Sequence, residues 1–174
     1  MMRRILYSLV LVGLLGLLLG SQQAKAQPKA IGLRWGWNLE AAYEHTLGPG
    51  FILATAGVAG YSAAITASAS YNWVPATWGD RNAWEFFVGG GLGLANYFWT
   101  PNVFVIGPMP CIGIQYSFWF PLMLTINWKP LFGVGIYSYP ESSVYGVVVD
   151  EAHTETHFFL PGLYDFALTV SYTF

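Results

Sequence analysis

Six charged side chains alternate with apolar residues along the chain, and they are the first candidates for chemistry. They are Arg34, Glu40, Glu44, Glu85, Lys129 and Asp165. Alternate residues of a strand share one face, so in a closed barrel these side chains would line the lumen. Burying them is costly unless they pair. We therefore expect a structural network of ion pairs and hydrogen bonds that plugs the lumen, and a gated proton or ion path along the same residues is the alternative.

A second group of polar residues lies in the acidic segment 138–161. His153, Glu155 and His157 alternate, so an extended ribbon would project all three to one side. Imidazole and carboxylate ligands at this spacing could hold a divalent metal. A solvated acidic loop is the simpler interpretation, and we predict neither a metal nor another cofactor.

The same segment holds residue types used by outer-membrane lipid-modifying enzymes. These enzymes combine His with Ser or an acid near the outer rim, and Ser142, Ser143, His153 and His157 supply the types here. No motif fixes their geometry, so we predict no catalytic residues and no enzymatic activity. The only cysteine, Cys111, excludes an internal disulfide, and we interpret it as a small residue of the barrel wall.

The last residues of the chain place an apolar side chain at every second position. This set comprises Phe166, Leu168, Val170, Tyr172 and Phe174, with small or polar residues between them. A period of two indicates a strand with two different faces. The ending resembles the C-terminal signal of bacterial outer-membrane β-barrels, which the barrel-assembly machinery reads. The resemblance implies that machinery as a partner.

Composition separates a membrane barrel from a soluble sheet. The chain is 55% hydrophobic and 9% charged, whereas soluble domains carry about 25% charged residues. Beyond the N-terminal segment no apolar run approaches the length of a membrane helix. Strands whose lipid-facing and lumen-facing residues alternate explain both facts. The predicted fold is all-β, a closed antiparallel transmembrane β-barrel of about eight strands with up-and-down topology.

The N-terminal segment has the organisation of a secretory signal peptide. Two Arg residues precede an apolar stretch, and Ala24-Lys25-Ala26 offers a cleavage site. We expect 1–26 to be cleaved and 27–174 to form a single domain in the outer membrane of a Gram-negative cell. That domain would hold four basic and nine acidic residues, a net charge of −5, so nucleic acid is not an expected partner.

Alternation and turn residues predict eight strands. Their approximate ranges are 30–37, 39–47, 50–58, 61–73, 83–98, 103–119, 121–137 and 162–174. Pro108 and Pro110 favour a loop or an irregular edge. The segment 75–82 is expected to be a polar loop, and 138–161 a long outward loop. Glycines at 89–91 would leave room in the lumen for large side chains opposite them.

Several segments resemble a family of small outer-membrane β-barrel proteins common in Bacteroidota. They are 30–36, 42–45, 71–73, 87–91 and 120–130. The resemblance implies a closed barrel of eight or so strands. The family is mostly uncharacterised, so no site residues carry over. The segments 107–110 and 138–161 depart from its pattern, which puts the sixth strand and the outer rim in question.

These observations favour a non-enzymatic barrel with a structural or surface-interaction role. We expect a monomer in contact with outer-membrane lipid, with 138–161 as its variable contact element. A barrel that transports small solutes or hydrophobic ligands is the alternative, and a lipid-modifying enzyme is less favoured. An eight-stranded lumen is only just wide enough for side chains, which argues against a permanent pore.

Overall fold

The chain is folded almost entirely into antiparallel strands. The computed structural model describes residues 29–59, 63–98, 101–140, 142–144, 147–150, 153–159 and 163–174, so the predicted signal segment 1–26 lies outside the described residues. The elements are β1 (Lys29–Trp35), β2 (Leu39–Leu47), β3 (Gly50–Ala59), β4 (Ala64–Trp78), η1 (Asp80–Asn82), β5 (Trp84–Tyr97), β6 (Asn102–Ser117), β7 (Leu122–Trp128), β8 (Gly133–Tyr139), β9 (Ser142–Val144), β10 (Val147–Asp150), β11 (His153–Phe159) and β12 (Phe166–Thr173). Within these ranges no helix is long and apolar enough to cross a membrane.

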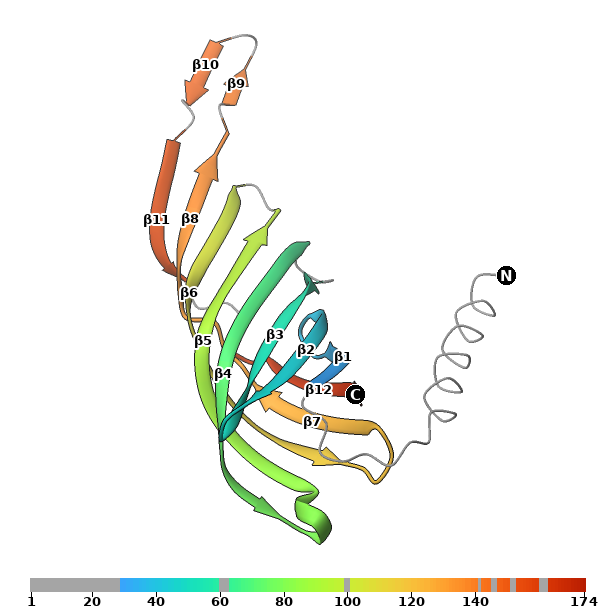
Figure 1. Ribbon diagram of the computed structural model, residues 1–174. Coiled ribbons are helices and arrows are strands. Elements are labelled where there is room, and N and C mark those ends of the chain that lie inside the picture. Colours follow the sequence, from blue (N-terminus) through green and yellow to red (C-terminus); the bar gives the residue numbers. More distant parts are fainter. Residues whose placement is uncertain are drawn as a thin grey trace, which may run out of the picture.

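Eight of the strands close into a ring. Strands β1 to β6 pair in sequence order, β12 pairs with β1 and with β7, and β7 pairs with β6. Every pairing is antiparallel. The predicted closed, up-and-down, eight-stranded barrel is therefore confirmed (Figure 1).

Cross-strand register gives the shear of the ring. Directly paired residues lead round the barrel in the order Glu85, Gln115, Thr125, Thr169, Arg34, Glu40, Gly57, Thr66 and Ala95. The path returns to β5 ten residues beyond its start, so eight strands close with a shear of ten. Such a stagger requires strongly tilted strands. It also means that neighbours in the lumen are far apart in sequence.

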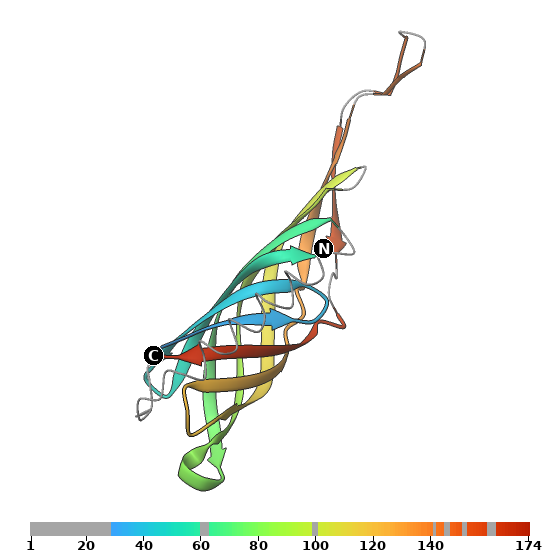
Figure 2. The same ribbon diagram turned by 90° about the vertical axis from the view of Figure 1, so that its right-hand side faces the viewer.

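The wall is taller on one side than on the other. Strand β8 pairs with the beginning of β6, and β11 pairs with β8, so these two strands extend the wall beyond the ring. The β9–β10 hairpin lies past them at the far tip (Figure 2). The segment 138–161, predicted as a loop, is thus largely a two-stranded ribbon.

The two prolines that predicted an irregular edge lie inside β6. The backbone N–H of Phe132 donates to the Pro108 carbonyl at 3.0 Å. In an antiparallel strand the N and the C=O of one residue point the same way, so the missing N–H of Pro108 faces the break between β7 and β8. Pro110 has the same parity. No ladder bond is lost there, which is why the strand tolerates both prolines.

The segment 75–82 is also more regular than expected. Strand β4 continues to Trp78 across a bulge between Trp73 and Ala76, and it pairs with β5 as far as Trp84. A bulge accommodates Pro75 within the strand. The polar turn is restricted to η1 and its neighbours. Two long strands therefore project below the ring (Figure 1).

Side chains alternate between the two faces as predicted. In β1 the odd positions are exposed and Ala30 and Arg34 are buried, and in β5 the parity is reversed. Two apolar clusters fill parts of the lumen. One is Ala59, Ala64, Ala95, Tyr97, Val103 and Val105, and the other is Ala42, Phe51, Leu53, Phe87 and Cys111. Cys111 is a buried, free wall residue.

Gly91 and Gly90 provide a matched test of inward packing. A Cβ on inward Gly91 would clash with the backbone of Ala69 and Ser70, whereas one on outward Gly90 lies 3.6 Å from its nearest neighbour. We expect Gly91→Val to lower the free energy of unfolding by about 3 kcal/mol or more, the upper range for overpacking. Gly90→Val should change it by under about 0.5 kcal/mol. Urea titration in detergent measures both, and equal losses would refute the assigned strand faces.

Candidate functional site

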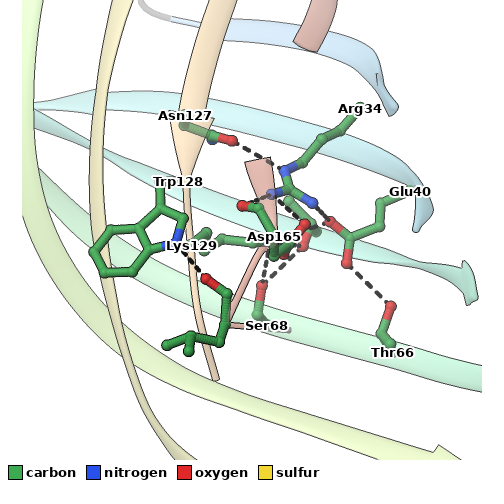
Figure 3. Close-up of polar contacts among 10 residues, drawn as sticks. Arg34, Glu40, Thr66, Ser68, Asn127, Trp128, Lys129 and Asp165 are labelled. Carbon is green, nitrogen blue, oxygen red and sulfur yellow. Dashed lines mark hydrogen bonds and ion pairs between the residues drawn. The ribbon is translucent and has the colours of Figure 1, made fainter. Parts of the chain in front are cut away.

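The centre of the lumen holds a buried ion-pair network, which we define as Arg34, Glu40, Lys129 and Asp165. Arg34 is fully buried; its Nη1 lies 2.9 Å from Glu40 Oε2 and its Nη2 lies 3.0 Å from Asp165 Oδ1. Lys129 Nζ lies 3.1 Å from the same Glu40 oxygen. Two cations therefore face two carboxylates, and the network is electrically balanced (Figure 3).

The break between β7 and β8 brings Lys129 into the network. Its backbone N–H donates to the Asp165 carbonyl at 3.1 Å, which joins the break to the segment before β12. Its ammonium donates to Thr55 Oγ1 at 2.7 Å and to Ser68 Oγ at 3.0 Å, in addition to Glu40. All three donor positions of the ammonium are thus used, as a buried charge requires.

Neutral side chains complete the network, and sequence reasoning did not assign them to it. Arg34 Nε donates to Asn127 Oδ1 at 3.1 Å, and Thr66 Oγ1 donates to Glu40 Oε1 at 3.0 Å. The inward parity of Thr66 and Asn127 was readable from the alternation. Their contact with the charges depends on strand register, which the alternation does not give.

The other two predicted lumen acids lie elsewhere. Glu85 accepts a 2.6 Å hydrogen bond from Gln115 Nε2, and Glu44 lies close to these two residues. Within the described part of the chain neither acid forms an ion pair with a cation. The predicted six-residue network is therefore divided into a balanced central group and a pair of acids beside Gln115, toward the foot of the barrel.

The alternation in the sequence leaves the partner of Lys129 open among the inward acids. The short ion pair is with Glu40. Glu85 is held by Gln115, and the side chain of Asp165 pairs with Arg34. The pairing follows from the shear, because the tilt of the strands brings β2, rather than β5, to the level of Lys129.

The three metal candidates share one face of β11, as their spacing predicted. His157 Nε2 lies 3.0 Å from Glu155 Oε2, and His153 Nε2 lies 3.9 Å from Glu155 Oε1. No described group of three such residues could hold a metal ion.

The aromatic rings of this ribbon restrain the histidines further. His153 stacks on Tyr139 with ring centroids 4.6 Å apart, and His157 meets Tyr137 edge-on at 5.5 Å. The side chains of Ser142 and Ser143, the serines that a lipid-modifying enzyme would combine with these histidines, lie outside the described ones. The described geometry is that of a two-stranded ribbon whose histidines contact Glu155 and the tyrosines of β8.

Lys129→Met tests the network. Removing the cation leaves Glu40 buried with one partner fewer, and breaking a buried pair costs about 3–5 kcal/mol. The double variant Lys129→Met with Glu40→Gln restores the balance between Arg34 and Asp165, and should recover much of that loss. Lys29→Met, at an exposed position, is the matched control. Chemical unfolding in detergent reports all three, and an unchanged stability of Lys129→Met would contradict the network.

Comparisons with known proteins find no relative, because no family model, no curated protein and no solved structure matches this chain. The resemblance to small Bacteroidota barrels therefore stays a prediction. Function has to be inferred from the barrel and its lumen.

Proposed function

We propose that this chain is an outer-membrane β-barrel protein with a non-enzymatic, structural or surface-interaction role. The observation that carries the proposal is the chemistry of the two barrel faces. On the described ring strands, the outward face carries a single charged residue, Lys29 at the beginning of β1, while the other strand charges point inward. A lipid-facing surface requires this distribution.

The outward face is too apolar for water. Leu33, Trp35 and Leu92 are each more than 60% exposed, and they belong to a band of large apolar side chains that surrounds the ring. Soluble monomers rarely expose contiguous apolar patches larger than a few hundred Å². Aromatic rings are concentrated at the foot of β4, β5 and β6, where Trp78, Trp84 and Tyr116 contact one another. Such rings favour the membrane–water interface.

The filled lumen supports a role other than conduction. The ion-pair network crosses the barrel, and apolar clusters pack on both sides of it. The ribbon of β8 and β11, with the β9–β10 hairpin at its tip, is the part that would reach furthest from the membrane, and His153, Glu155 and His157 are accessible on it. We infer that contacts with other molecules are made there.

Membrane fractionation tests the proposal directly. The full chain should sediment with outer membranes, and its mobility on gels should change on boiling, because a closed barrel satisfies its backbone hydrogen bonds internally and resists detergent. A known periplasmic protein is the control for soluble carry-over. Recovery of this chain in the periplasmic fraction would refute the membrane assignment.

Planar-bilayer recording separates the surface role from solute transport. The purified barrel should show no reproducible conductance steps, because an eight-stranded lumen filled by side chains leaves no continuous water path. A 16-stranded porin reconstituted in the same bilayers is the positive control. Reproducible steps from this chain would favour the transport alternative over the plugged lumen.

A further inference from the structure

A cavity of about 40 Å³ lies in the lumen next to the ion-pair network, on the side from which β8 and β11 project. Its floor is formed by Glu40, Lys129 and Asp165, and its walls include Trp37 and Leu131. About 10–15 Å³ is needed for one water, so the cavity has room for a polar group of a few atoms. It lies where the closed ring gives way to the taller part of the wall.

The cavity presents two hydrogen-bond acceptors with free capacity, Asn38 Oδ1 and the Asp165 carboxylate, and both residues line it. Asn38 Oδ1 is a buried atom without a hydrogen bond. Asp165 Oδ1 has an ion-pair contact with Arg34 at 3.0 Å, and a carboxylate can accept further hydrogen bonds. Lys129, the cation of the floor, already donates to Glu40 and to two hydroxyl groups. An occupant would therefore have to supply N–H or O–H donors.

Apart from Thr66 and Ser68, the remaining walls are apolar. Leu131, Met109 and the rings of Trp37 and Tyr97 line the cavity, and Trp37 is half exposed. Because Trp37 both lines the cavity and is half exposed, an alkyl chain could extend along its ring toward the apolar outer face.

We propose that this cavity binds the head of a small amphiphile, an alkyl chain whose polar group donates hydrogen bonds. The head would donate to Asn38 and Asp165, and the first part of the chain would contact Trp37 and Leu131. Because the ion-pair network is already balanced, the head need not bring a charge. The shared chemistry is that of an alcohol or a primary ammonium. The site goes beyond the proposed function, and its binding can be measured without any assumption about the role of the protein.

Ligand-observed saturation-transfer NMR on the full barrel in lipid nanodiscs tests the site. The probes are 1-hexanol, hexylammonium and hexanoate, which share one chain but differ in the head. Saturable binding is expected for hexanol, hexylammonium or both, above the signal of empty nanodiscs, and the pair shows which donor is preferred. Ionised hexanoate offers no donor and should not bind.

Two variants locate the binding. Gly93→Leu fills the cavity, since a Cβ there lies 3.0 Å from Leu131 Cδ1 and 3.5 Å from Met109 Sδ, both ends of flexible side chains. It should abolish saturable binding. Gly90→Leu, on the outward face of the same strand, is the matched control and should bind as the unmodified chain does.

Asn38→Ala keeps the test valid if Gly93→Leu fails to fold. Loss of the mobility change on boiling would show that failure. Asn38→Ala removes one acceptor of the cavity and should weaken binding about tenfold, the loss of roughly one hydrogen bond. The proposal is overturned if neither donor probe binds saturably, if hexanoate binds equally well, or if folded Gly93→Leu or Asn38→Ala binds as tightly as the unmodified chain.

Discussion

The narrowness of the lumen is the constraint on which the rest of the structure depends. Eight strands leave an interior that side chains must fill, and this chain fills it with charges as well as with apolar groups. Arg34 has no exposed surface, and Glu40 and Lys129 are each 3% exposed. Charges buried this deeply persist only when they are paired and hydrogen-bonded. The neutral partners Thr55, Ser68 and Asn127 are therefore as necessary as the ion pairs themselves.

The shear of the barrel determines which residues become partners. Arg34 and Asn127 are 93 residues apart in sequence, and Lys129 and Glu40 are 89 apart, yet each pair lies within hydrogen-bond distance. Such contacts form only when the sheet has closed in its final register. The network thus links correct closure to the pairing of the charges, because a slipped register would separate them. This coupling favours one register over its neighbours.

Alternation and composition together predicted the fold class, and alternation predicted the direction of most side chains. It placed Arg34, Glu40 and Lys129 inward, as the structure has them. It could not predict the partner of Lys129, since pairing across the lumen depends on tilt and register. It also missed β11 and the continuation of β4 to Trp78, because proline and polar residues there have the composition of loops. Their strand conformation comes from neighbours that extend beyond the ring.

The difference in height between the two sides of the wall gives the molecule two structurally different parts. Around β1, β2 and β12 the wall is short, and the ion-pair network fills the lumen beside it. On the side of β6, β8 and β11 the sheet continues with one edge unpaired among the described strands. At the junction of these parts the cavity combines a polar floor with an apolar wall. An external molecule with both kinds of surface finds complementary groups at that junction, whereas a purely polar solute would leave the apolar wall unmatched.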